Sequence, residues 1–287
     1  MRSSHETCYR ISGIKIVLVK VMNLDRFIPN RLKVHLIAMQ VNAISTIFLR
    51  SKKLLPLLDL FGGGGREILH GTALFPEEGF HVIDVGAYRG WFTAISSKIV
   101  GSCGRVYSFE PEPSNFETLR KVVFYGGLKN VNVFRLALND SDGFELLYIS
   151  RIPSMHSLVL KRGHKKITVP CMKLDTIAKL KGFPKLDLIK VDVEGAELKV
   201  LKGCRGILNE FKPIFSIDVN HYEGEFEEVS TLMREFDYEI VSLFGRADRP
   251  FSIVAYPPHK RSLAKHLINK TRKLALRINC TKRSHEL

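Results

Sequence analysis

The stretch His81–Thr93, HVIDVGAYRGWFT, decides the fold that this sequence predicts. Its apolar, β-branched run ends at Asp84, and Gly86 and Gly90 follow before a helical pattern begins. This order predicts a strand that enters a helix through a glycine turn. Glycine lacks a Cβ and adopts positive φ readily, so such a turn allows the backbone to approach a nucleotide-like ligand closely. The stretch therefore predicts a cofactor site.

After residue 80, short β-branched runs alternate with helical patterns, which is typical of an α/β fold with a mostly parallel sheet. The main strands are predicted at residues 81–85, 105–110, 131–138, 186–193, 213–219, 238–244 and 251–256. Helices are predicted at residues 91–100, 114–125, 195–209 and 226–236. Only GRADRP separates the last two strands, a link too short for a crossover, so we expect these strands to pair antiparallel.

An insertion separates the third and fourth main strands. It contains two further candidate strands, at residues 143–150 and 166–172, and a polar loop between them that could cover the mouth of the sheet. Ligands of open parallel sheets bind beyond the carboxyl ends of the strands. The insertion is therefore expected beside the site.

The chain has 287 residues, 45% of them hydrophobic, which is enough for a sizeable core. We divide it into a helical N-terminal extension (residues 1–79), a central domain (residues 80–258) and a basic amphipathic C-terminal tail (residues 259–287). The net charge is +15, and the tail holds nine Lys or Arg against one Asp or Glu. The basic character therefore belongs mainly to the tail, and the central domain is nearly balanced.

Both flanking regions contain amphipathic helical patterns. The apolar face in the extension consists of Val34, Ile37, Val41, Ile44 and Phe48. It favours a helix packed on the central domain or on a second subunit of a homodimer, with attachment to a membrane surface as the alternative. The apolar face in the tail consists of Leu263, Leu267, Leu274 and Ile278. It predicts a solvated terminal helix or a disordered arm, or else contact with anionic lipid or nucleic acid.

The five cysteines are scattered and form no C-x-x-C pair, which argues against a disulfide framework and a zinc site. The first apolar stretch, from Ile14, is interrupted by Lys15 and Lys20 and is not a convincing secretory signal. No segment reaches the roughly 20 apolar residues that a membrane-spanning helix needs. We therefore expect a cytoplasmic protein, with peripheral membrane contact through the tail as an open alternative.

Two strand ends suggest the kind of cofactor. The pattern D-x-G-x-x-x-G from Asp84 to Gly90 differs from the G-x-G-x-x-G of nicotinamide enzymes and from a P-loop, so pyrophosphate recognition is disfavoured. The second strand ends at Glu110, 24 residues after Gly86, which is the separation expected for a ribose-binding acid on the neighbouring strand. A carboxylate there can accept both ribose hydroxyls.

The fourth strand ends in a dense group of charges, KVDVEGAE, from Lys190 to Glu197. Asp192 and Glu194 alternate with valines, so they should project to the same side. Such carboxylates could fix a cofactor ammonium group, accept a substrate proton or hold a divalent cation. Alternatively, Glu194 and Glu197 only complement the dipole of the following helix.

Five stretches, VIDVGAYRGWFT, GRVYSFEPEPSNFETLRK, NVNVFRLALND, LDTIAK and LDLIKVDVEGAELKVLKG, occur in this order between about residues 80 and 220. Together they resemble the FkbM-type family of S-adenosylmethionine-dependent methyltransferases, and the motif IKVDVEGAE is specific to that family among seven-stranded methyltransferases. The resemblance implies a Rossmann-like class I sheet of order 3-2-1-4-5-7-6 with the last strand antiparallel. It also implies methyl transfer to a hydroxyl oxygen. A glycan, a lipid-linked saccharide and a small metabolite all fit as the acceptor, and the amphipathic ends of the chain favour a membrane-associated glycan or lipid.

The resemblance also implies which residues bind S-adenosyl-L-methionine. The methionine part would lie against Asp84, Gly86, Ala87 and Gly90, with Tyr88 in the same turn, the ribose on Glu110, and the adenine beside Ala137, Leu138 and Asn139. Asp192 would lie near the methionine amino group and the sulfonium. Many relatives have Asn where Tyr88 stands. They also commonly have I-E-I-H near the fifth strand, where this chain has Ile217-Asp218-Val219-Asn220 followed by His221.

The expected catalytic residues are Asp192, Glu194 and His221. A base that takes the acceptor proton would be Glu194, His221 or, less favoured, His156. The competing mechanism uses Asp192, Glu194 and Asp218 to hold magnesium or calcium, and we favour the mechanism without a metal. A nucleic-acid methyltransferase is disfavoured by the balanced central domain and by the lack of an N-P-P-Y motif. A catalytically silent cofactor-binding module is the third alternative.

Overall fold

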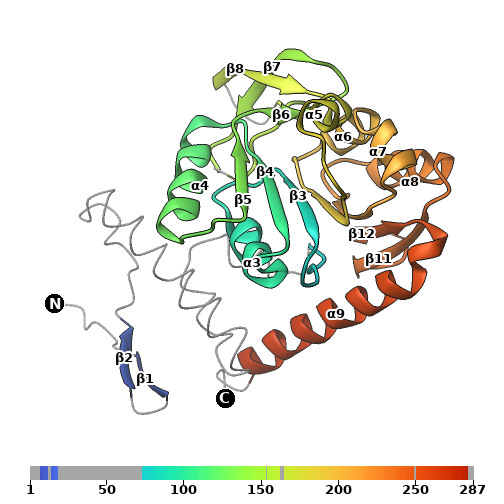
Figure 1. Cartoon of the computed structure of the whole chain (residues 1–287). Helices are drawn as coiled ribbons and strands as arrows, with labels where there is room; N and C mark the ends of the chain where they lie inside the picture. Colours follow the sequence, from blue (N-terminus) through green and yellow to red (C-terminus); the bar gives the residue numbers. More distant parts are fainter. Residues whose placement is uncertain are drawn as a thin grey trace.

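The computed structural model describes residues 73–152, 154–161, 165–248 and 250–283, and two strands near the N-terminus. These strands, β1 (Thr7–Ile11) and β2 (Ile14–Leu18), pair antiparallel (Figure 1). They add a β-hairpin to an extension that was expected to be helical. The helix expected at residues 34–48 lies outside the described residues.

One seven-stranded sheet forms the centre of the domain (Figure 1). Its strands are β3 (His81–Val85), β4 (Arg105–Phe109), β5 (Val131–Phe134), β9 (Leu188–Val191), β10 (Ile214–Asp218), β11 (Glu239–Gly245) and β12 (Pro250–Tyr256). They lie in the order β5-β4-β3-β9-β10-β12-β11, and β12 is antiparallel to both of its neighbours. Numbered along the chain, this order is 3-2-1-4-5-7-6. The predicted fold class and the antiparallel last strand are confirmed.

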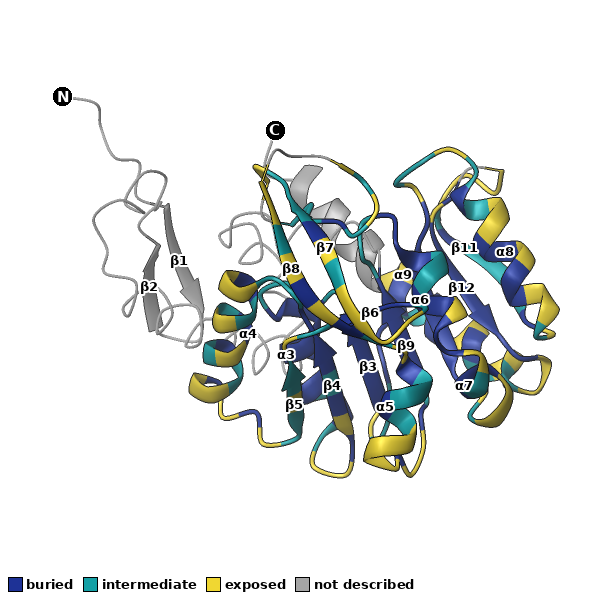
Figure 2. Cartoon of the chain, turned by 90° about the horizontal axis from the view of Figure 1, so that it is seen from above, coloured by how far each residue is buried: buried dark blue, intermediate teal, exposed yellow. Residues whose placement is uncertain are grey.

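Helices cover both faces of the sheet, so its central strands are apolar on both sides (Figure 2). The helices are α3 (Trp91–Val100), α4 (Pro113–Tyr125), α5 (Leu174–Lys181), α6 (Glu197–Lys202), α7 (Arg205–Glu210), α8 (Glu225–Glu235), the 3₁₀ turn η3 (Pro258–Lys260) and α9 (Arg261–Arg283). Consecutive residues of β3 enter opposite cores. Val82 packs with residues of α3 and α9, and Ile83 packs with residues of α5 to α8.

Two predicted elements are in fact broken. The strand expected at residues 131–138 leaves the main sheet after β5, because its partner β4 ends just before Pro111, and the chain then pairs with the insertion as β6 (Ala137–Leu138). The helix expected at residues 195–209 is divided into α6 and α7 at Gly203. A Cβ at Gly203 would lie 1.9 Å from the backbone oxygen of Asn139, so glycine allows the helix to pack on this turn.

The insertion forms its own three-stranded sheet, as its two predicted strands indicated. Strand β8 (Lys165–Met172) lies between β6 and β7 (Gly143–Ile149), parallel to β6 and antiparallel to β7. We call this the insertion sheet. It lies above the edge of the main sheet where β3 and β4 end (Figure 1).

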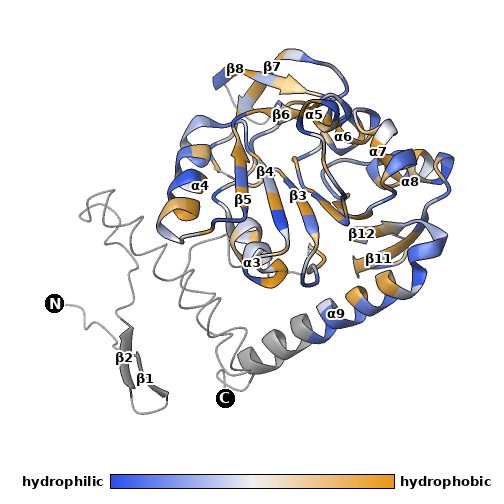
Figure 3. Ribbon diagram, in the orientation of Figure 1, coloured by the Kyte–Doolittle hydropathy of each residue, from blue (hydrophilic) through white to orange (hydrophobic). Residues whose placement is uncertain are grey.

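The C-terminal tail is a helix packed on the domain, so neither a solvated helix nor a disordered arm describes its first half. Ala264, Leu267 and Ile268 are buried against Val254 and Tyr256 of β12. Apolar and polar positions alternate along α9 in Figure 3. The side chains of Leu274 and Ile278 lie outside the described set. Among the described residues, no helix is both long and apolar enough to cross a membrane.

The variant Leu267→Ala tests this packing. Leu267 is 0% exposed, and truncating a buried leucine usually lowers the free energy of unfolding by about 2–5 kcal/mol. The matched control is Leu180→Ala on α5, since Leu180 is 71% exposed and its truncation should change stability by at most about 0.5 kcal/mol. Urea unfolding of both variants measures the difference. Equal stabilities would show that α9 does not pack on the sheet.

Candidate active site

The carboxyl ends of β3, β4 and β9 surround a cavity of about 660 Å³, part of which is open to solvent. The β3 turn contributes Val85, Gly86 and Tyr88, the β9 turn contributes Asp192, Val193 and Glu194, and the loop of the insertion contributes Ser154, His156 and Leu158. The loop therefore lies at the mouth of the sheet.

The turn after β3 comes close to the backbone of β9. Gly86 has φ 73°, and a Cβ there would lie 1.9 Å from the backbone oxygen of Asp192. Only glycine fits this approach. The N–H groups of Gly86 and Ala87 both donate to the carbonyl oxygen of Phe109, at 3.1 and 3.0 Å, which holds the turn against the end of β4.

Glu110 occupies the next strand end and orders both neighbouring turns. One carboxylate oxygen accepts from the N–H of Tyr88 at 2.9 Å and the other from the N–H of Glu112 at 2.9 Å. Burial raises the pKa of Glu110 to about 8, although these two N–H groups favour its charged form. Tyr88 itself has φ 49°, in the left-handed region that Asn tolerates better than most residues. An Asn at position 88 would therefore suit the backbone better than the Tyr of this chain.

Lys190 joins the ends of β3 and β9. Its side chain is 8% exposed, and its Nζ donates to the backbone oxygen of Gly86 at 2.9 Å. The same atom lies 3.5 Å from carboxylate oxygens of both Asp84 and Asp192. Asp84 in turn accepts from the hydroxyl of Thr93 in α3 at 2.6 Å. A buried cation needs such partners, so this network fixes the two strand ends relative to each other.

The turn after β9 places Glu194 in the cavity and Glu197 beneath it. Glu194 has φ 57° and Gly195 has φ 100°. Glu197 is 0% exposed, and its two oxygens accept from the N–H groups of Val193 and Gly195 at 2.8 and 2.9 Å. The hydroxyl of Ser157, in the insertion loop, donates to the backbone oxygen of Glu194 at 2.6 Å. Glu197 therefore shapes the turn, and Glu194 is the carboxylate that reaches the cavity.

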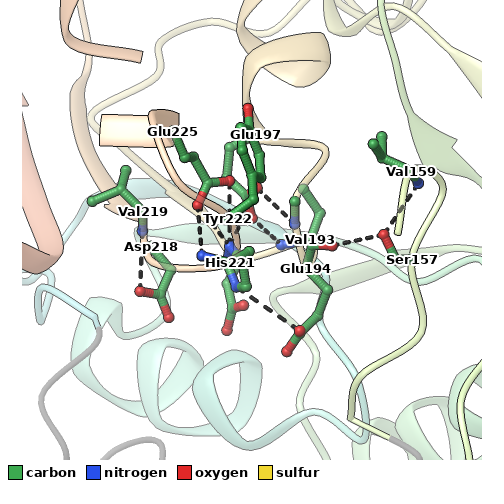
Figure 4. Close-up of polar contacts among 12 residues, drawn as sticks. Ser157, Val159, Val193, Glu194, Glu197, Asp218, Val219, His221, Tyr222 and Glu225 are labelled. Atoms are coloured by element: carbon green, nitrogen blue, oxygen red, sulfur yellow. Dashed lines mark hydrogen bonds and ion pairs between the residues drawn. The ribbon is translucent and has the colours of Figure 1, made fainter. Parts of the chain in front are cut away.

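Carboxylates surround the imidazole of His221 (Figure 4). Its Nδ1 lies 3.2 Å from Glu225 and 3.5 Å from Glu197, and its Nε2 lies 3.9 Å from Glu194. Burial alone would lower the pKa of His221, but the bonds to Glu197 and Glu225 outweigh it and raise the pKa to about 12. His221 is therefore an imidazolium at neutral pH and cannot accept a proton there.

The metal alternative named Asp192, Glu194 and Asp218, whereas the structure brings Asp192, Glu197 and His221 together. Their ligand atoms lie within 4.8 Å of one another. Metal ligands must be deprotonated, and His221 holds its proton between carboxylates. Both oxygens of Glu197 already accept backbone N–H groups. Burial and the charge of Asp192 raise the pKa of Asp218 to about 8. This donor set fits a proton-linked cluster better than a metal site.

The predicted cofactor residues fall into two groups. Gly86, Tyr88, Glu110, Ala137, Leu138 and Asp192 line the cavity. The other four are buried and lie behind the residues that line the cavity: Asp84, Ala87, Gly90 and Asn139. Of the predicted catalytic residues, Asp192 and Glu194 line the cavity, while His221 contacts Glu194 from outside it.

Sequence reasoning missed the roles of Lys190 and Glu225. Lys190 lies two residues before Asp192 in a strand, so its side chain points to the same side, and this spacing could have indicated the pair. Glu225 begins α8, and its bond to the N–H of His221 at 2.8 Å needs the folded turn between them. Only the structure shows that contact.

The sheet order, the glycine turn after the first strand and the acid at the end of the second define a class I methyltransferase, whose cofactor is S-adenosyl-L-methionine. The residues present fit this cofactor, because the acceptor side chains of Glu110, Asp192 and Glu194 line the cavity together with the Gly86 turn. A family model described as "Methyltransferase FkbM domain" matches residues 84–240. The chain belongs to the FkbM methyltransferase family.

The chain is similar to proteins that are named as methyltransferases, and it spans about three fifths of the first of them. Methyltransferase sdnD of Sordaria araneosa is 28% identical over 154 residues, which cover 42% of this chain and 59% of that protein. Methyltransferase 1 of Beauveria bassiana is 22% identical over 190 residues, which cover 59% and 76%. The crystal structure of methyltransferase FkbM from Methylobacillus flagellatus aligns with a TM-score of 0.47 and 18% identity, over 76% of this chain and 59% of that one.

The variant Gly86→Ala tests the close approach at the site. Its Cβ would meet the backbone oxygen of Asp192 at 1.9 Å and push the ends of β3 and β9 apart. We expect calorimetric titration with S-adenosyl-L-methionine to show a loss of affinity of at least about tenfold, since the loss of one hydrogen bond to a charged group costs about 1.5–3 kcal/mol.

Gly127→Ala is the matched control. Gly127 also has positive φ, at 60°, but a Cβ there meets no atom within 4 Å. It therefore carries the backbone strain without the collision, and its affinity should equal that of the unaltered chain. Equal affinities for all three proteins would contradict the assignment of the cavity.

Proposed function

We propose that this protein transfers the methyl group of S-adenosyl-L-methionine to a hydroxyl oxygen of a glycan, a lipid-linked saccharide or a small metabolite. The observation that supports this most is the meeting of the Gly86 turn, Glu110 and the carboxylates Asp192 and Glu194 at one cavity. The cofactor supplies an activated methyl group, so the residues have mainly to orient the acceptor and exclude water. Membership of the FkbM family supports the methyl transfer, and the oxygen acceptor is the further step of the proposal.

On this proposal, each wall of the cavity holds a different part of the cofactor. Glu110 accepts the ribose hydroxyls, because it lines the cavity and each of its oxygens has acceptor capacity beyond its backbone bond. Ala137 and Leu138 provide the apolar wall for the adenine. The side chain of Asp192 is 19% exposed, and its carboxylate accepts a hydrogen bond from the amino group of the methionine part.

Glu194 is the proposed general base. It lines the cavity and its side chain is 18% exposed. The other two candidates are less suited to accept a proton. His221 is already protonated, and Nδ1 of His156 accepts from the N–H of Ser150 at 3.0 Å. Burial lowers the pKa of His156, so it is neutral with its proton on Nε2, where it donates.

The pH dependence of cofactor affinity tests the role of Glu110. Its pKa of about 8 means that the free protein holds a proton on this group at neutral pH. Ribose binding needs the carboxylate, so affinity should rise as pH increases towards that pKa and level off above it. We expect an increase of about tenfold between pH 7 and pH 9.

Calorimetric titration of the Glu110→Gln variant provides the comparison. The amino group of the ligand titrates in both proteins, so only the difference between them reports on Glu110. The variant should bind more weakly and lose that part of the pH dependence. Glu117→Gln, at an exposed residue of α4, should behave as the unaltered chain. If Glu110→Gln kept the full pH dependence, Glu110 would not be the ribose ligand.

The acceptor can be found by mass spectrometry of extracts incubated with the protein and a cofactor that carries a labelled methyl group. With that acceptor, Glu194→Gln should lower kcat by about 10²- to 10⁴-fold and leave cofactor affinity unchanged. Glu210→Gln, an exposed change on α7, is the control. Label found only on nitrogen or carbon would contradict the proposed oxygen acceptor, and an unchanged kcat would exclude Glu194 as the base.

A further inference from the structure

The insertion sheet has one buried face and one bare face. Leu147, Val169 and Cys171 point towards Ala137 and form a small core. In the antiparallel register of β7 and β8, Phe144 pairs with Pro170, Leu146 with Thr168, and Tyr148 with Lys166. Directly paired residues project to the same side of a sheet. These six residues form what we call the outer face.

The outer face is unusually apolar for a surface. Phe144 is 75% exposed and Leu146 is 38% exposed. Ile152 and Val159, in the adjoining loop, are 54% and 40% exposed. Among the described residues, these are four of the eight large apolar side chains that are exposed. A concentration of this kind marks an interaction surface more often than scattered single residues do.

The outer face is continuous with the active-site cavity. Phe144, Leu146, Tyr148 and Leu158 share an open depression on the insertion. Leu158 also lines the cavity, beside His156 of the same loop. A molecule that covers the outer face therefore lies at the entrance to the site.

The charge of the insertion is strongly positive. Residues 143–172 hold five Lys or Arg and a single acid, Glu145, whereas the central domain is nearly balanced. Arg151, Lys161, Lys165 and Lys166 are all exposed. Exposed apolar side chains beside lysines are the combination that binds an anionic lipid surface. A second copy of this chain on the same face would bring like charges together, which is unfavourable.

We propose that the outer face docks on an anionic membrane surface, with Phe144 and Leu146 inserted among the lipids and the lysines at the headgroups. This orientation presents the mouth of the cavity to the membrane. The further step, that the acceptor hydroxyl is carried by a lipid, rests on the proposed function. Docking itself requires no methyl transfer.

The test uses the full chain and a local probe, because other segments could also bind lipid. The chain has one tryptophan, Trp91, which is 8% exposed, so a new tryptophan on the surface can be followed against a constant background. The probe variant is Phe144→Trp. The matched control is Phe124→Trp on α4, because Phe124 is 76% exposed and lies outside the insertion. Both are titrated with vesicles of phosphatidylcholine, with and without phosphatidylglycerol, and with brominated lipids as quenchers.

We expect the emission of the Phe144→Trp variant to move to shorter wavelength and to be quenched by brominated lipid when phosphatidylglycerol is present. The Phe124→Trp variant should show neither change. In the Phe144→Trp background, Lys165→Gln with Lys166→Gln should weaken the titration by about fivefold for each lysine removed. Lys129→Gln with Lys202→Gln, also exposed, should have no such effect.

Three results would overturn the proposal. One is a tryptophan emission of the Phe144→Trp variant that does not change when vesicles are added, even if the protein binds the vesicles through another segment. Another is a response that depends on protein concentration without vesicles, which would indicate a second copy on this face. The third is a titration that the lysine changes leave unaltered. Calorimetry of the same preparations with S-adenosyl-L-methionine separates membrane docking from the proposed methyl transfer. If the protein binds the cofactor but Phe144→Trp does not insert, only the docking proposal is refuted.

Discussion

The backbone contact between the turn after β3 and the end of β9 is the constraint on which the site depends. Gly86 allows it, because any Cβ would collide with the backbone oxygen of Asp192. Lys190 then holds the two strand ends together through the Gly86 carbonyl and the carboxylates on either side. As a result, Glu110 after β4 and Asp192 and Glu194 after β9 line one cavity. A side chain at position 86 would change the distance between the strand ends that carry them.

The fold could be predicted because its signals are local. Short β-branched runs, glycine turns and the six-residue link before the last strand indicated an α/β sheet with an antiparallel last pair, and the resemblance to the FkbM family implied the order 3-2-1-4-5-7-6 that the structure shows. The break between β5 and β6 could not be predicted in the same way. The run from residue 131 to 138 has β-type residues throughout, and the chain changes sheet because β4 ends first. Such a break depends on the neighbouring strand.

The candidate site shows the same division. Glu110, Asp192 and Glu194 could be found from the sequence, because each follows a parallel strand and the carboxyl ends of such strands lie at the same edge of the sheet. The state of His221 could not. It depends on Glu197 beneath the β9 turn and on Glu225 at the start of α8, which the folded chain brings to one imidazole. Because His221 is protonated, Glu194, which lines the cavity and lies 3.9 Å from Nε2 of His221, is the candidate base that remains.

The central claim is that the cavity between β3, β4 and β9 binds S-adenosyl-L-methionine. Hydrogen–deuterium exchange of the full chain, with and without the cofactor, tests it most directly. The account predicts added protection in the peptides that contain residues 84–90, 109–112 and 192–195, because residues of these three turns line the cavity. Calorimetric binding with protection confined to other parts of the chain would contradict it.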